Sequence, residues 1–159
     1  MPRQNPPTGS EIAEKARQLR FDHNKSVEKT RDKDKAHVRF TQALFERQIT
    51  KHEIEDGIVL GRVEADPGES RTKLRPGKYH LFLSKVGDTW KGYAELNGEI
   101  AIEAKRVEVK EGTETRDISD VKPTIEFGSI CFTACITVLI PVPFWPYEIP
   151  VPYCWVWCI

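Results

Sequence analysis

The sequence ends on the stretch CFTACITVLIPVPFWPYEIPVPYCWVWCI, residues 131–159, and covering this stretch is the main physical problem that the fold has to solve. Of the 33 residues from Phe127 onward, 23 are apolar, and Glu148 is the only side chain among them that is charged at neutral pH. All four cysteines and three of the four tryptophans lie in this segment. A segment so rich in apolar rings is expected to leave water for a core, an interface or a lipid surface.

The spacing of cysteines and prolines in this segment favours a hairpin over a membrane helix. The two Cys-x-x-x-Cys motifs are symmetric about a midpoint between residues 144 and 145, so an antiparallel pair would bring the cysteines together two by two. β-Branched residues favour strands, and three prolines between residues 141 and 146 interrupt any single spanning helix. We expect arms at Ile130–Ile140 and Val151–Ile159, with a wide proline-rich loop between them. A tail anchor in a membrane is the alternative.

The cysteines allow a metal site as a second alternative. Its ligands would be Cys131, Cys135, Cys154 and Cys158. Zinc requires all four thiolates around one ion, whereas cysteines four apart on a strand are separated by about 13 Å. We therefore expect no metal and no other cofactor, and we interpret the cysteines as small buried hydrophobic residues. The first residues contain no apolar run, which predicts a cytoplasmic protein in which structural disulfides are rare.

Residues 54–126 are typical of a small antiparallel sandwich. From Ile58 the apolar residues alternate, and turn sequences such as Gly87-Asp88 and Asn97-Gly98 separate the strands. A two-residue turn at Gly87-Asp88 places Leu83 opposite Gly92. For the next hairpin, a three-residue loop at 96–98 would keep Ile100 and Ile102 on the apolar face. After residue 105 the alternation changes parity, which predicts a bulge or a corner where the chain crosses to another sheet.

Part of this region carries a resemblance to a known family. Val59–Leu83 combines a Gly-x-Val strand with a Leu-x-Pro-Gly-x-Tyr-x-Leu turn and strand, residues 74–81. This pattern resembles the opening of Ig-like sandwiches of the carboxypeptidase-regulatory or transthyretin-like type. The resemblance implies a sandwich fold and implies no catalytic residues.

Residues 1–53 read as a charged, partly helical or disordered arm. Thr8 and Glu11 form a capping box, which predicts a short helix from Gly9 to Phe21. Residues 22–35 are densely charged and have little to bury, so we expect a solvated helix or no structure there. Apolar residues at helical spacing then predict a second helix over Lys33–Lys51.

The composition disfavours nucleic-acid binding, and the motifs disfavour catalysis. The chain has 24 basic and 24 acidic residues, so it has no net charge to attract nucleic acid. The four histidines are isolated in the sequence, and the glycines lie where turns require them. We therefore predict a protein that is not an enzyme.

The fold prediction is an α+β chain: a helical arm over 1–53, a sandwich over 54–126 and an extended apolar docking segment over 127–159. The predicted function is structural or assembly-related, with the tail docking on a protein partner, another copy or a membrane surface. The residues expected to make this contact are Phe132, Phe144, Trp145, Tyr153, Trp155 and Trp157.

Three other interpretations remain open for the tail. It can complete the core of a monomer. It can anchor an accessory protein in a membrane. It can also be the Ser/Thr/Cys-rich part of a ribosomal peptide precursor that enzymes modify and release.

Overall fold

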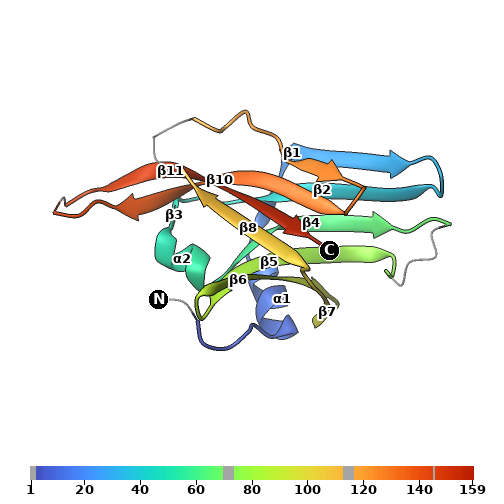
Figure 1. The fold of residues 1–159 in the computed structure, drawn as a ribbon, viewed down its shortest axis with the longest axis horizontal. Helices are drawn as coiled ribbons and strands as arrows, with labels where there is room; N and C mark the ends of the chain where they lie inside the picture. Colours follow the sequence, from blue (N-terminus) through green and yellow to red (C-terminus); the bar gives the residue numbers. More distant parts are fainter. Residues whose placement is uncertain (1–2, 70–73, 113–116, 145) are drawn as a thin grey trace.

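The computed structural model describes residues 3–69, 74–112, 117–144 and 146–159, and it shows a mostly β protein with 59% of residues in strands (Figure 1). Within these ranges the strands form two sheets. The first sheet runs in the order β1 (Arg20–Arg31), β2 (Ala36–Leu44), β4 (Ile58–Asp66), β5 (Gly77–Val86), β6 (Thr89–Leu96) and β7 (Glu99–Glu103). The second runs in the order β3 (Ile49–Thr50), β10 (Cys131–Pro141), β11 (Glu148–Cys158) and β8 (Arg106–Glu111), and β9 (Thr124–Glu126) also pairs with β10. The described pairs are antiparallel except that β3 runs parallel to β10.

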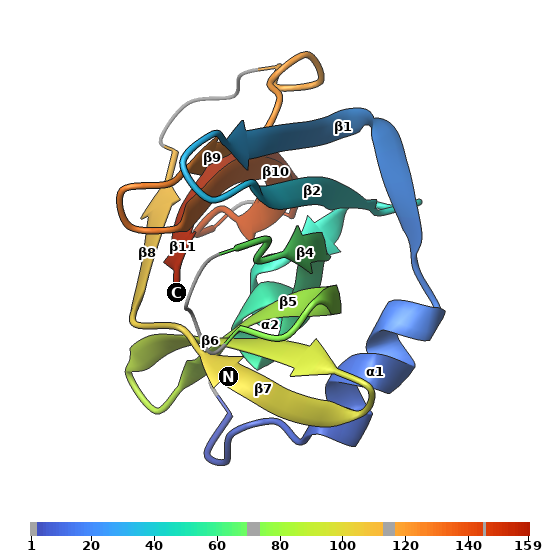
Figure 2. The same cartoon turned by 90° about the vertical axis from the view of Figure 1, so that its right-hand side faces the viewer.

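The two sheets face each other across one apolar core, which Figure 2 shows from the end of the molecule. Strands from all three segments predicted by the sequence contribute to this core, so the boundaries at 54 and 127 do not separate independent units. Phe40 of β2 and Phe132 of β10 meet in it, with ring centroids 5.5 Å apart. The apolar tail therefore supplies the second layer that the first sheet needs.

The helices α1 (Gly9–Arg17) and α2 (Lys51–Asp56) lie against the first sheet. The predicted N-terminal helix begins at Gly9 as expected: the Thr8 side chain accepts a hydrogen bond from the Glu11 amide at 3.1 Å and caps α1. The helix ends at Arg17 instead of Phe21, because Arg20 and Phe21 already belong to β1. Ile12 and Ala16 of α1 pack on Phe82 and Tyr93, which lie on the face of the first sheet away from the main core. Covering these two rings is the structural role of α1.

The predicted second helix is wrong, and the mobile helical arm is replaced by strands. Residues 20–31 form β1 and residues 36–44 form β2, which pairs with both β1 and β4. Ala36, Val38 and Phe40 are buried, whereas Arg39 between the last two is exposed. Ala36 and Phe40 are four apart, as on one face of a helix, whereas Val38 between them fits only a spacing of two. Pairing with β4 forms the strand and buries Val38 and Phe40 in the main core.

The predicted register is confirmed for one hairpin and wrong for the next. Leu83 opposes Gly92 across the Gly87-Asp88 turn, where Gly87 has a φ of 60°. The β6–β7 connection is a two-residue Asn97-Gly98 turn with φ values of 53° and 85°, not the predicted three-residue loop. The extra residue is accommodated inside the ladder instead, by a register shift beyond Glu95, and Ile100 is left 37% exposed.

The predicted change of sheet after residue 105 is confirmed. The Ala104 amide still donates to the Gly92 carbonyl at 2.8 Å, whereas the following strand, β8, pairs with β11 of the second sheet. The chain thus passes from the first sheet to the second at residues 104–106. Val107 and Val109 then pack against the main core from the β8 side.

Candidate functional site: an apolar hairpin end and a pocket in the same molecule

The predicted C-terminal hairpin is confirmed, and it is closed by disulfides. β10 and β11 oppose each other over eleven residue pairs, from Cys131 opposite Cys158 to Pro141 opposite Glu148. Disulfides join Cys131 to Cys158 and Cys135 to Cys154. The expectation of reduced, merely hydrophobic cysteines is wrong, because the antiparallel register places the sulfur atoms of each opposed pair within bonding distance.

The disulfides also bear on the metal alternative and on localisation. All four candidate thiolates are consumed in the two bridges, and no group of three or more His, Cys, Asp or Glu side chains in the described residues could hold a metal ion. Disulfides are typical of oxidising compartments, which argues against the predicted cytoplasmic location. In the described part of the chain, no helix combines the length and the apolar character needed to cross a bilayer.

Four of the six residues predicted to dock are in the core of the chain itself. Phe132, Tyr153, Trp155 and Trp157 are at most 3% exposed, so the interpretation that the tail completes the core is correct for them. Burial raises the pKa of the Tyr153 phenol far above its ordinary value. The sequence did contain this signal, because the three residues of β11 alternate along the strand and therefore share one face.

The end of the hairpin remains outside the core. We call residues 141–149 the hairpin end; Trp145, one of the predicted docking residues, lies outside the described residues. Phe144 is 107% exposed, Tyr147 is 65% exposed and Ile149 is 39% exposed. In Figure 1 this end projects at the left beyond the other strands.

Local chemistry explains why the hairpin opens there. Prolines at 141, 143 and 146 cannot donate the backbone hydrogen bonds that would continue a ladder. Phe144 adopts a φ of 64°, a left-handed conformation that is uncommon for a residue with a bulky side chain. Sparsely populated backbone conformations cluster at functional sites, which makes the hairpin end a candidate site.

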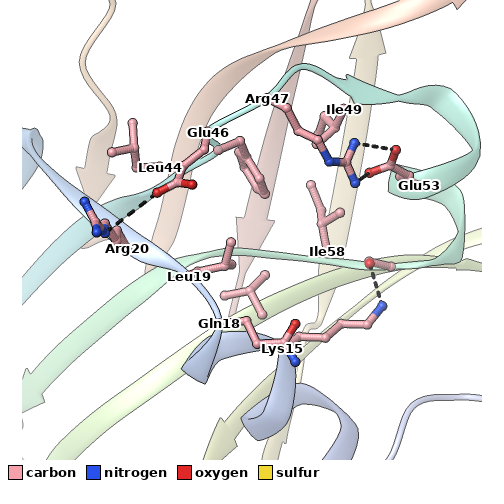
Figure 3. Close-up of a pocket in the computed structure, with 13 residues that line it drawn as sticks. Lys15, Gln18, Leu19, Arg20, Leu44, Glu46, Arg47, Ile49, Glu53 and Ile58 are labelled. Atoms are coloured by element: carbon pink, nitrogen blue, oxygen red, sulfur yellow. Dashed lines mark hydrogen bonds and ion pairs between the residues drawn. The ribbon is translucent and has the colours of Figure 1, made fainter.

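A pocket of about 470 Å³ opens between α1, the end of β2, β3, α2 and the start of β4 (Figure 3). We call it the end pocket. Its apolar lining consists of Leu19, Leu44, Phe45, Ile49, Ile58 and Val59. Its charged residues are Lys15, Arg20, Glu46, Arg47 and Glu53. Sequence reasoning did not anticipate this pocket, because its walls come from separate elements that only the tertiary fold assembles.

The charged side chains of the end pocket differ in how strongly they interact with their partners. Arg47 donates two hydrogen bonds of 2.8 Å to Glu53, and this guanidinium holds the pKa of the Glu53 carboxyl below its ordinary value. Lys15 donates to the Gly57 carbonyl at 3.0 Å, as Figure 3 shows. Arg20 and Glu46 meet at 3.7 Å with side chains 81% and 75% exposed, so this pair is weak and can exchange partners.

The helix that forms one wall of the end pocket is tied down by an ion pair. Arg3 donates to both carboxylate oxygens of Glu11 on α1, at 2.7 Å and 2.6 Å. The same guanidinium also donates to the Asn5 carbonyl at 2.8 Å and to the Asp56 carbonyl, at the end of α2, at 3.1 Å. The hydrogen bond from Arg3 holds the pKa of Glu11 below its ordinary value.

We expect this tether to lose its effect in acid. Because the folded protein favours ionised Glu11, its contribution is complete above the ordinary glutamate pKa and disappears as the pH falls through the lowered one. Arg3→Ala should lower the free energy of unfolding by about 1 kcal/mol at pH 7 and by less near pH 3. Urea unfolding at both values measures this. Arg17→Ala, which removes an exposed pair with Glu14 on the same helix, is the control and should show little effect at either pH. An equal loss of stability for Arg3→Ala at both pH values would contradict the expected role of ionised Glu11.

A histidine–glutamate pair on the first sheet has a structural role, which its contacts explain. Glu95 is 3% exposed, and one of its oxygens lies 2.8 Å from His80 Nδ1. The other accepts the Gly98 amide at 2.9 Å and so ties the β6–β7 turn to this pair. The Phe21 ring stacks on His80 from β1, with centroids 6.0 Å apart.

No protein-family model, curated protein or solved structure matches the chain. The resemblance of Val59–Leu83 to carboxypeptidase-regulatory or transthyretin-like sandwiches therefore stays a prediction. What the structure defines is a class: a mostly β protein of two facing sheets, with a disulfide-bonded hairpin that extends beyond its core.

Proposed function

We propose that the protein is a non-enzymatic assembly protein that associates with further copies of itself through the hairpin end. The observation that carries this proposal is the complete exposure of Phe144 at the end of a hairpin in which four other predicted docking rings, Phe132, Tyr153, Trp155 and Trp157, are buried. Trp155 and Trp157 of the same hairpin are buried in the core, whereas Phe144 and two neighbouring apolar side chains are exposed to water. A cluster of exposed apolar side chains of this kind is typical of a contact surface.

The stem of the hairpin supports this role because it is rigid. Disulfides cross it at Cys131–Cys158 and Cys135–Cys154, and the ladder continues to Pro141 opposite Glu148. A contact surface on a pre-organised element loses little conformational entropy on binding. Prolines in the hairpin end restrict its backbone further.

The size of the hairpin end predicts weak, reversible association. Burying about 200 Å² of ring surface from Phe144 and Tyr147 contributes about 5 kcal/mol. Association costs about 4–15 kcal/mol in lost translational and rotational freedom. The two terms are comparable, so we expect concentration-dependent assembly instead of a permanent dimer.

Replacing Phe144 and Tyr147 together with serine should weaken self-association at least tenfold, because the exposed rings that would be buried are removed. Sedimentation velocity across a concentration series measures this. Ile100→Ser, which removes an exposed apolar side chain from β7, is the control and should behave as the unmodified protein does. A protein that stays monomeric throughout the series, or a double variant that associates normally, would refute the proposal.

A membrane surface is the second candidate for the hairpin end. Aromatic side chains are favoured at the bilayer interface, and prolines bring fewer unpaired N–H donors into it. The exposed carboxylate of Glu148 at the base of the hairpin end opposes binding to anionic lipids. Flotation with phosphatidylcholine vesicles, with and without phosphatidylserine, tests this candidate. The two proteins compared are the unmodified protein and the variant with serine at positions 144 and 147.

The precursor interpretation is a further prediction with its own test. Thr133 and Thr137 lie in β10 on either side of Cys135, which is joined to Cys154 in a disulfide. Dehydration or cleavage of this segment would change the mass of the natural product. Intact mass of protein isolated from its source decides the question.

A further inference from the structure

We infer that the end pocket is the acceptor for the hairpin end of a second copy. This inference rests on the proposed function and adds to it the surface that receives the hairpin. The contact is then between two different patches of the same chain, a projecting ring and a pocket.

The distribution of exposed apolar side chains supports this pairing. Six large apolar side chains are exposed in the described part of the chain, and four of them belong to these two features. Phe144, Tyr147 and Ile149 are in the hairpin end, and Leu44, 40% exposed, lines the end pocket. Both features therefore leave apolar surface in water that one contact would remove from it.

The dimensions of the end pocket suit an aromatic side chain. A dry cavity of about 150 Å³ lined by aliphatic side chains is enough to bind benzene. The end pocket has about 470 Å³, and Figure 3 shows Leu19 and Ile58 lying between its two ion pairs, with Leu44 at the edge beside the Arg20–Glu46 pair. The ring of Phe144 and part of its neighbours fit into such a volume.

The charges of the two features are complementary. Among its described lining residues, the end pocket has three cations, Lys15, Arg20 and Arg47, and two carboxylates, Glu46 and Glu53. The hairpin end has a single charged side chain, the exposed carboxylate of Glu148. Arg20 is the rim cation with the weakest partner, so we assign it to Glu148 of the incoming copy.

The fold prevents a chain from filling its own pocket. β3 carries Ile49 of the pocket wall and pairs with Val138 and Leu139 of β10, so the wall and the stem are parts of one sheet. From there the disulfide-bonded stem continues outward to the hairpin end (Figure 1). Because the two patches differ, the contact is heterologous and propagates into head-to-tail chains or rings.

A mixing experiment tests the pairing. The first variant, Phe144→Asp with Tyr147→Asp, keeps the end pocket and loses the ring. The second, Leu44→Asp, keeps the hairpin end and places a charge in the end pocket. Each variant alone should self-associate at least tenfold more weakly than the unmodified protein. Mixed in equal amounts, they should form a one-to-one heterodimer and nothing larger, because one intact hairpin end meets one intact pocket. Sedimentation velocity with one variant fluorescently labelled measures this, and Ile100→Asp is the surface control.

The outcomes separate this inference from the proposed function. If the hairpin-end variant is impaired and the pocket variant associates normally, the hairpin end is a contact surface but the end pocket is not its acceptor. If both variants are monomeric and no heterodimer forms, the two patches do not pair. If neither variant differs from the unmodified protein, or if the unmodified protein only binds vesicles, both proposals are refuted.

A charge-exchange experiment provides a second test of the pairing, and it does not depend on whether the Leu44→Asp variant folds. Arg20→Glu should weaken self-association, and Glu148→Arg should do the same. Combining the two in one chain should restore association toward the original strength, because the ion pair is re-formed with reversed polarity. Circular dichroism melting of each variant confirms that it is folded. Absence of rescue would overturn the assignment of Arg20.

Discussion

Replacing all four cysteines with alanine is expected to lower the free energy of unfolding by about 6 kcal/mol. The bridges span 27 and 19 residues, and closing such loops in the unfolded chain is worth about 3.5 and 3 kcal/mol separately. The bridges are nested. Once the inner one is closed, the outer one closes a remaining loop of only about ten residues, worth about 2.7 kcal/mol. Because small domains have only about 5–15 kcal/mol of stability, this loss decides whether the chain folds at all.

The matched measurements use one bridge at a time. Urea unfolding of the Cys131→Ala/Cys158→Ala and Cys135→Ala/Cys154→Ala variants should each show a loss of about 2.5 kcal/mol. The reduced unmodified protein should behave as the variant without cysteines does, and intact mass before and after reduction verifies the bridges. Losses below about 1 kcal/mol for both pairs would mean that the bridges contribute little beyond the hairpin ladder itself.

Trp157→Ala is expected to cost about 4 kcal/mol, which is a large effect for a single substitution. The Trp157 side chain is 0% exposed, and its indole N–H donates to the Phe82 carbonyl at 3.3 Å across the two sheets. The indole lies directly over Gly92, where an added Cβ would meet the indole nitrogen. Removing the indole therefore leaves a large cavity in the core and removes its hydrogen bond to the Phe82 carbonyl.

A double-mutant cycle tests this contact. Gly92→Ala alone should destabilise the protein by about 2 kcal/mol, because it forces the indole out of its place. In the Trp157→Ala background, the same change should cost clearly less, because the clash with the indole is gone and only the one with the Val107 side chain remains. Trp90→Ala, at a half-buried position nearer the surface, is the control and should cost less than Trp157→Ala. Additive losses at positions 92 and 157 would contradict the packing of the indole on Gly92.

Local patterns predicted much of the fold correctly. The capping box at Thr8 identified α1, the Gly87-Asp88 turn set the β5–β6 register, and the symmetric cysteines identified the C-terminal hairpin. Each of these features depends on residues that are neighbours in sequence or opposed across one turn. The prediction for β2 failed because Ala36 and Phe40 are spaced as in a helix, whereas pairing with β4 buries Val38 between them as well and forms a strand.

The candidate site, too, depends partly on local sequence and partly on the tertiary fold. The sequence by itself determined that residues 127–159 must leave water and that they fold back as a hairpin, because apolar content and proline positions are local properties. The tertiary structure alone decided which aromatic side chains are buried in the core and which are exposed. Trp155 and Trp157 lie on the inner face of the second sheet, whereas Phe144 lies beyond the area that the first sheet covers. It also created the end pocket, because a hollow between α1, α2 and the ends of three strands exists only when distant segments are packed together.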